Sequence, residues 1–365
     1  MTAVPSQTLR VSLAERSYDI EIGTGNLPNI GEFAARLQTP RHYVLISDKH
    51  VEDPHAFVVA NALAKPNVRV ELLVIAPGEE QKSMANLSML LDKMLELKAD
   101  RQTVVVAVGG GVIGDLAGFV AASYARGVPF LQVPTTLLAQ VDSSVGGKVG
   151  VNLTGAKNMA GAFWQPLGVL IDTAVLATLP EREYRSGLAE VVKYGVILDP
   201  EFFAWLEGHV ADLNARSPEA LRHIIYRSCE LKADVVRQDE RELTGLRAVL
   251  NYGHTFCHAF ENLTGYGTYL HGEAVAIGML CASRLAESLG RIPAEVTARQ
   301  HALLTALGLP VAVPALDPKS VIDVMSRDKK VHDGKLRFVL PSRLGHVELV
   351  GDVTAEQVTE ALGNS

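Results

Sequence analysis

The sequence predicts a two-domain protein, an α/β domain built on a parallel sheet followed by an all-α domain. The chain has 365 residues, and chains of this length usually fold around more than one hydrophobic core. Short β-branched runs alternate with amphipathic stretches up to about residue 178, and beyond it the apolar residues recur at helical spacing. We therefore expect domains at 1–178 and 179–365.

Five continuous apolar runs predict the strands of the sheet, at 42–48, 68–75, 103–108, 130–134 and 168–172. Continuous apolar strands that alternate with helices are typical of a parallel sheet. The earlier segments 8–13 and 18–23 are expected to form a hairpin or an edge addition to that sheet.

The second half is expected to be helical. Apolar residues follow helical spacing in five segments, 186–198, 217–236, 246–263, 272–289 and 295–307. Pro180, followed by acidic residues, suits a helix start and marks the beginning of this half.

The composition indicates a globular enzyme. Hydrophobic residues make up 48% of the chain and charged residues 21%. The net charge is −7 and the basic residues are scattered, so nucleic acid is not an expected partner. The longest apolar tract, 103–125, contains three consecutive glycines and Asp115, which argues against a membrane span. Three cysteines, an odd number, and no apolar leader after Met1 favour the cytoplasm.

Gly109, Gly111 and Gly114 form a G-x-G-x-x-G spacing between a predicted strand and helix. Backbone N–H groups and the helix dipole can bind a phosphate there, as in a Rossmann-like dinucleotide site, although a tight glycine turn has the same spacing. A standard unit places an acid about twenty residues further on, and 130–136 contains none. Asp48, at the end of an earlier strand, is the alternative ribose ligand. The segment is therefore a dinucleotide site with rearranged topology, or no site.

Polar residues among glycines extend this region. Thr135 and Thr136 follow a predicted strand, and Asp142 and Lys148 come after a short apolar turn. Lys157 and Asn158 lie among small residues in the next segment. Lysines in such surroundings indicate either an anion site or a solvated loop.

His254 and His258 are four residues apart, which places both imidazoles on one side of a helix, as in metal-binding helices. This spacing favours them as a ligand pair. His271, at the head of the next helix, and Glu190, inside an apolar helix, are further candidates. A buried carboxylate must be neutral, paired or coordinating, so Glu190 is a strong one. Together they indicate a three-ligand catalytic site with an open position.

Several long motifs resemble one family, the 3-dehydroquinate synthases. They are GEEQKS (78–83), GGGVIGDLAGF (109–119), RGVPFLQVPTTLLAQVDSSVGGK (126–148), AKNMAGAFWQP (156–166), GLAEVVKYG (187–195), LNYGHTFCHAFE (250–261), HGEAVAIGM (271–279) and RDKKV (327–331). The resemblance implies an NAD-binding α/β domain followed by a helical metal-binding domain. It also implies zinc or cobalt bound by Glu190, His254 and His271. His258 then becomes a second active-site imidazole beside the metal.

The resemblance implies two further sets of residues. NAD would contact Asp48, Glu79, Lys82, Gly111, Val112, Ile113, Gly114, Asp115, Thr135, Thr136, Asp142, Lys148, Lys157 and Thr178. Catalysis and substrate binding would involve Arg126, Asp142, Lys148, Asn158, Lys193, Lys232, Glu242, Arg247, Asn251, His258 and Lys330. Lys329 is the alternative to Lys330, a loop of variable length affects the placement of Glu242, and Arg126 would come from the other subunit of a homodimer.

The implied reaction converts 3-deoxy-D-arabino-heptulosonate 7-phosphate to 3-dehydroquinate and phosphate, the second step of the shikimate pathway. Hydride passes to NAD, phosphate is eliminated, the hydride returns, and an internal aldol step closes the ring. Two alternatives share the architecture, another sugar-phosphate cyclase and a metal-dependent alcohol or glycerol dehydrogenase. A substrate carboxylate requires extra cations, and the basic residues among the implied contacts favour the dehydroquinate reaction.

Overall fold

The structure is a computed structural model that describes residues 6–154, 156–265, 267–327 and 336–363. The chain forms two compact units: one comprises residues up to Leu179 together with Leu221–Arg241, the other comprises Pro180–Ala220 and residues from Glu242 onward. None of the described helices combines the length and apolar character needed to cross a bilayer.

The first unit contains a seven-stranded sheet of order β1-β2-β9-β6-β5-β3-β4. Its strands are β1 (Gln7–Val11), β2 (Tyr18–Gly23), β3 (His42–Asp48), β4 (Arg69–Ile75), β5 (Val104–Gly109), β6 (Phe130–Pro134) and β9 (Gly168–Asp172). β1 and β2 form an antiparallel hairpin, and every other pairing in the sheet is parallel. The hairpin therefore also extends the edge of the sheet, as the sequence predicts.

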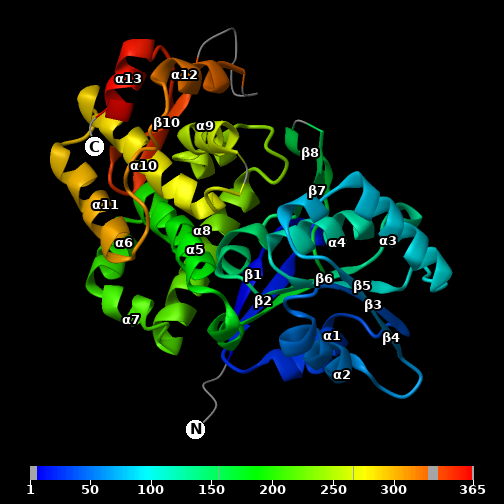
Figure 1. Ribbon diagram of the computed structural model, residues 1–365. Helices are drawn as coiled ribbons and strands as arrows, with labels where there is room; N and C mark the ends of the chain where they lie inside the picture. The colour runs from blue at the N-terminus through cyan, green and yellow to red at the C-terminus, as the bar shows by residue number, and fades with distance from the viewer. Residues whose placement is uncertain (1–5, 155, 266, 328–335, 364–365) are drawn as a thin grey trace. The chain divides into compact units, whose positions relative to one another are not determined.

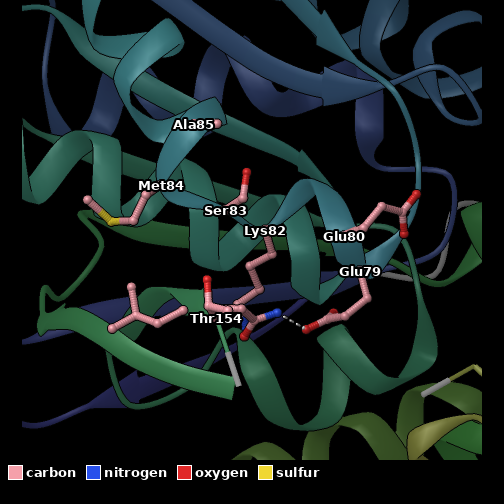
Figure 2. A pocket seen from close by; sticks show the side chains of 9 residues that line it. Glu79, Glu80, Lys82, Ser83, Met84, Ala85 and Thr154 are labelled. Carbon is pink, nitrogen blue, oxygen red and sulfur yellow. Dashed lines mark hydrogen bonds between the residues drawn. The ribbon is translucent and has the colours of Figure 1, made fainter. Parts of the chain in front are cut away.

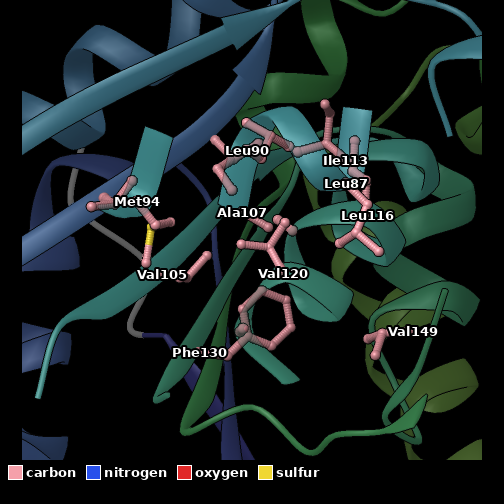
Figure 3. Packing of buried hydrophobic residues seen from close by; sticks show 14 of the residues in the cluster. Leu87, Leu90, Met94, Val105, Ala107, Ile113, Leu116, Val120, Phe130 and Val149 are labelled. Atoms are coloured by element: carbon pink, nitrogen blue, oxygen red, sulfur yellow. The ribbon is translucent and has the colours of Figure 1, made fainter. Parts of the chain in front are cut away.

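Helices cover both faces of this sheet, which is why its central strands are buried and mainly apolar. The helices are α1 (Ile30–Leu37), α2 (Phe57–Leu63), α3 (Met84–Glu96) and α4 (Gly111–Ser123). α1 and α2 pack on one face, and α3 and α4 pack on the other (Figure 1). Figure 3 shows the second of these cores, in which Leu90 and Met94 of α3 meet Val120 of α4 and Val105 of β5.

A second hairpin replaces the loop that the sequence leaves open after β6. β7 (Lys148–Leu153) pairs antiparallel with β8 (Ala156–Phe163). The small residues allow this pairing, since a Cβ on Gly150 would lie 2.6 Å from the Ala160 carbonyl oxygen. Lys148, Lys157 and Asn158 are thus carried on strands.

α8 (Pro218–Gln238) contributes most of its length to the first unit, although the sequence division assigns it to the helical domain. Its buried face explains the difference. The Cys229 thiol donates to the Gln140 carbonyl at 3.1 Å, and Lys232 Nζ donates to the Asp142 carbonyl at 2.6 Å. Sequence spacing predicts a helix here but does not indicate what that helix packs against.

The second unit is mainly helical. Its helices are α5 (Glu181–Leu198), α6 (Pro200–Gly208), α7 (Val210–Asn214), α9 (His254–Thr264), α10 (His271–Ser288), α11 (Ala294–Ala306), α12 (Pro318–Arg327) and α13 (Ala355–Gly363). One hairpin, β10 (Phe338–Arg343) with β11 (His346–Val350), is not foreseen in the sequence. Pro180 precedes α5 directly, as expected.

Glycines bring α9 and α10 into close contact. A Cβ on Gly278 of α10 would lie 2.3 Å from the carbonyl oxygen of Gly253, the residue before α9. Gly253 itself has φ +79°, a conformation that favours glycine. Two of the three helices that carry the candidate metal ligands, α9 and α10, therefore pack backbone against backbone.

Candidate active site

Side chains from α5, α9 and α10 converge on one point. Glu190 lies on α5, His254 is the first residue of α9, and His271 is the first residue of α10. One ligand atom from each lies within 4.8 Å of the other two. Glu190 Oε1 is 3.7 Å from His254 Nε2 and 3.8 Å from His271 Nε2. These separations are too long for hydrogen bonds but suit atoms that share one cation.

The Glu190 carboxylate is buried, with a side chain only 1% exposed. Lys193, one turn later on α5, contacts it as an ion pair. Neither carboxylate oxygen makes a hydrogen bond of acceptable geometry with any residue that the structure describes. Because an incompletely satisfied buried carboxylate is costly, this donor set of one carboxylate and two imidazoles fits a divalent ion such as zinc or cobalt.

The far nitrogens of both imidazoles also have partners. His254 Nδ1 is 3.1 Å from the Tyr252 carbonyl oxygen, and His271 Nδ1 is 3.4 Å from Glu261 Oε1. Burial lowers the pKa of His271, but the neighbouring Cys257, Glu261 and Glu190 raise it by more, so that it lies well above its ordinary value. Protons therefore compete with a cation for His271.

His258 is not among the three ligand atoms that meet. It lies one turn after His254 on α9, and the two rings pack edge to face with centroids 5.7 Å apart. The partner that sequence spacing favours for His254 is thus replaced by His271, whose ring centroid is 5.3 Å from that of His254. His258 remains beside the centre, as the family resemblance implies.

The first unit has a separate candidate site at the carboxyl edge of its sheet. The chain runs from β3 to β4 in one direction and from β5 to β6 in the other, so the connections diverge between β3 and β5. Ligands of parallel sheets bind at such a switch point. Asp48 ends β3, and Gly109–Gly111 link β5 to α4. The acid and the glycine turn therefore lie on neighbouring strands, in the reverse of the standard sequence order.

Lys82 contacts two of the other predicted residues. Its ammonium group contacts the carboxylate of Asp115 on α4 and the side-chain oxygen of Asn158 on β8. Burial raises the pKa of the Asp115 carboxyl, and the charge of Lys82 opposes that rise. Figure 2 shows Lys82 in a pocket with Glu79, whose carboxylate accepts a hydrogen bond from Asn152 at 2.8 Å.

The residues after β6 and β9 complete this edge. Thr135 donates its N–H to the Gly109 carbonyl at 3.0 Å, and its buried hydroxyl has no hydrogen-bond partner among the described residues. The Thr136 hydroxyl accepts from Ala139 N at 3.1 Å. Thr178 is exposed, but its hydroxyl lies 2.9 Å from His55 Nε2 and so already has a hydrogen-bond partner.

The predicted substrate residues are divided between the two units. In the first unit, Lys232 Nζ lies 2.9 Å from Asp142 Oδ1, and Arg126 is exposed in a turn with φ +70°. In the second unit, buried Arg247 lies 3.5 Å from Glu242. Asn251 ends the helical turn Leu246–Asn251 just before α9. Lys329 and Lys330 lie outside the described residues.

Sequence reasoning missed Glu261, which contacts His271, and Tyr252, whose carbonyl contacts His254. A signal for Glu261 was present, since it lies seven residues after His254 and therefore on the same helix face. No side-chain pattern could have indicated the Tyr252 carbonyl.

Comparisons with known proteins bear on both units. Residues 72–186 match the family model for the N-terminal part of 3-dehydroquinate synthase, and residues 187–331 match the model for its C-terminal part. A 3-dehydroquinate synthase of Rhodopirellula baltica is 52% identical over 364 residues, which covers 98% of this chain and 97% of the relative.

Solved structures of two other synthases are also similar. One is a 2-deoxy-scyllo-inosose synthase complexed with carbaglucose-6-phosphate, NAD+ and Co2+, with a TM-score of 0.88, 30% identity, and coverage of 98% of this chain and 99% of that one. The other is the 2-epi-5-epi-valiolone synthase of Streptomyces hygroscopicus subsp. jinggangensis with NAD+ and Zn2+ bound, with a TM-score of 0.87, 31% identity, and coverage of 96% and 97%.

Proposed function

The chain belongs to the 3-dehydroquinate synthase family, and from that premise we propose how its residues serve the NAD- and metal-dependent conversion of 3-deoxy-D-arabino-heptulosonate 7-phosphate to 3-dehydroquinate and phosphate. The single observation that carries the proposal is the convergence of Glu190, His254 and His271 within one unit.

In this proposal Glu190, His254 and His271 hold one zinc or cobalt ion. Such an ion would supply Lewis acidity: it would polarise the substrate hydroxyl that is oxidised, and it would stabilise the negative charge that develops on the same oxygen when the proton adjacent to the new ketone is removed. Glu190 supplies the negative charge of the donor set, and both histidines present Nε2. The Tyr252 carbonyl oxygen accepts a hydrogen bond from His254 Nδ1 and so fixes the orientation of that ring.

NAD is assigned to the carboxyl edge of the first unit's sheet. When bound, NAD would supply reversible hydride acceptance. Asp48 would accept hydrogen bonds from ribose hydroxyls, and the N–H groups at the start of α4 would receive the pyrophosphate. The incompletely satisfied Thr135 hydroxyl at the same edge supports the assignment.

The substrate carries a phosphate and a carboxylate, and the proposed cationic residues would bind these two negative groups. Lys232 in the first unit and Lys193 and Arg247 in the second are all buried. Each lies beside a carboxylate, that of Asp142, Glu190 or Glu242 respectively. Buried cations without a compensating partner are costly, so these pairs keep the cations in place before an anion binds. Arg247 suits a bidentate grip on a carboxylate or phosphate.

The reaction returns the hydride that it removes, which gives a direct test. Purified enzyme with NAD and the seven-carbon acid phosphate should release phosphate with no net rise in NADH absorbance. Phosphate release from a different sugar phosphate alone would identify another cyclase, and net NADH without phosphate would identify a dehydrogenase. The 52% identity to a 3-dehydroquinate synthase, against 30% and 31% to the two other synthases, supports the first outcome.

A homodimer in the cytoplasm completes the proposal. Arg126 stands exposed in a tight turn with a left-handed backbone, where it could reach a neighbouring subunit. The three cysteines are free and buried, which suits a reducing compartment. Light scattering coupled to size exclusion would measure the oligomer, and Arg126→Ala should retain the dimer but reduce turnover.

A further inference from the structure

One face of α9 carries four residues of the metal centre's surroundings. His254, Cys257, His258 and Glu261 follow one another at helical intervals, so their side chains share one side of the helix. The proposed function uses His254 as a ligand and His258 as its neighbour. It leaves Cys257 and Glu261 without a role.

Glu261 is buried, with a side chain 6% exposed. Its carboxylate lies 3.4 Å from Nδ1 of His271, on the side of the ring opposite to the nitrogen that faces Glu190. Glu261 therefore places a buried carboxylate beside Nδ1 of His271, the ring nitrogen that does not face the proposed metal. A ligating imidazole commonly donates its second N–H to a carboxylate or carbonyl, which fixes its tautomer and ring orientation.

We propose that Glu261 is a positioning residue that accepts a hydrogen bond from Nδ1–H of His271 and so holds Nε2 of that ring toward the metal. The inference rests on the proposed metal site. The Tyr252 carbonyl has the matching place at His254, 3.1 Å from its Nδ1. Both imidazoles are then oriented from behind, one by a backbone oxygen and one by a carboxylate.

Two other arrangements of the same residues are distinguishable. Cys257 Sγ is 3.9 Å from His271 Nδ1, but sulfur is a weak acceptor, so the thiol would orient the ring less well than the carboxylate. Cys257, Glu261 and His271 also lie close enough to hold a cation themselves. In that case His271 would bridge two ions, and the protein would bind two per chain.

The proposal predicts graded losses of metal affinity. Glu261→Ala removes the acceptor and should weaken Co²⁺ binding about 10–100-fold. Glu261→Gln keeps an acceptor oxygen without the charge and should lose less. Cys257→Ala should change affinity less than about threefold, because in our account the sulfur is not the acceptor.

The experiment titrates the metal-free full-length chain with Co²⁺ against a competing chelator and follows the visible absorbance of bound cobalt. Thermal unfolding is measured with and without the ion. A merely structural role for Glu261 would lower the unfolding temperature equally in both conditions. A positioning role reduces the increase that cobalt produces. Glu207→Ala is the matched control, since it removes a carboxylate of the same unit that pairs with Arg299.

The outcomes separate this inference from the site on which it rests. If His271→Ala does not weaken cobalt binding, the metal assignment fails. If His271→Ala abolishes binding but Glu261→Ala leaves it unchanged, only the positioning role is overturned. Two ions per wild-type chain, reduced to one by Glu261→Ala, would also overturn it, because Glu261 would then be a ligand.

Discussion

A Cβ atom on Gly272 would lie 1.8 Å from the carbonyl oxygen of Ser186. Gly272 is the second residue of α10, directly after His271, and Ser186 is one turn before Glu190 on α5. The N–H of Gly272 also donates to the Ser186 hydroxyl at 3.0 Å. This contact of two backbones sets the distance between two of the three proposed metal ligands.

Gly272→Ala should therefore separate α10 from α5 and weaken metal binding. Overpacking of this kind costs about 1–3 kcal/mol of unfolding free energy. Urea unfolding and metal analysis measure the two effects. Gly208→Ala, at the end of α6 with open space around it, is the control and should be nearly neutral. Full metal content in Gly272→Ala would show that the contact does not set the ligand geometry.

The stability of the protein should also depend on pH through Glu273, in the first turn of α10. Its carboxylate accepts from Arg182 at 2.7 Å and from the Leu270 N–H at 2.8 Å. Burial raises the pKa of Glu273, but Arg182 and the Leu270 N–H lower it by more, so the folded-state pKa lies below the ordinary 4.5. A carboxyl with a depressed pKa contributes stability above its unfolded-state pKa and loses it as the pH falls through the folded-state value.

Glu273→Gln should thus be less stable than the wild type at pH 7, by about 1 kcal/mol, and nearly equal to it below the folded-state pKa. Urea unfolding of both proteins between pH 7 and pH 3 gives the comparison. A difference that stays constant over this range would show that the charge of Glu273 is not the cause.

Asp48 should matter for the cofactor more than for the fold. Its side chain accepts from His50 N at 2.8 Å, and asparagine can replace it in that turn. Asp48→Asn should therefore fold normally but bind NAD about tenfold more weakly, because a charged acceptor for the ribose hydroxyls is lost. Calorimetric titration with NAD measures this, with the exposed Asp53→Asn as control. Equal affinity in both variants would exclude Asp48 as the ribose ligand.

Lys82 and Asp115 should behave as a coupled pair. Removing Lys82 alone, as in Lys82→Met, leaves the Asp115 carboxylate without its cation and should destabilise the protein by about 3 kcal/mol. The double variant Lys82→Met with Asp115→Asn should recover part of that loss. Chemical denaturation of the two single variants and the double variant gives the coupling energy, and strict additivity would show that the contact contributes nothing.

The sequence predicts most of the sheet because its central strands are short, mainly apolar runs with turn residues between them and the helices. The run at 42–48 coincides with β3, and those at 130–134 and 168–172 coincide with β6 and β9. The hairpin of β7 and β8 escaped prediction because small residues and glycines dominate it and neither face is continuously apolar. Such composition is equally compatible with a loop.

The candidate site, too, is predicted only where the signal lies within one segment of the sequence. Spacing along one helix associates His254 with His258, because residues four apart share a face. His271 lies on the next helix, and its approach depends on glycine contacts between helices, which a single sequence does not encode locally. The sequence offers His271 as one candidate among several, and only the family resemblance selects it over His258 as the partner of His254. The acid at Asp48 similarly precedes the glycine turn in the chain, although the two lie on neighbouring strands.

Metal analysis of His271→Ala and His258→Ala tests the convergence of Glu190, His254 and His271 most directly. Both proteins are prepared with excess Zn²⁺, separated from free metal, and compared with the wild type. The wild type and His258→Ala should retain one ion per chain, with slower turnover in His258→Ala, whereas His271→Ala should lose metal and activity together. A full complement of zinc in His271→Ala would contradict the account.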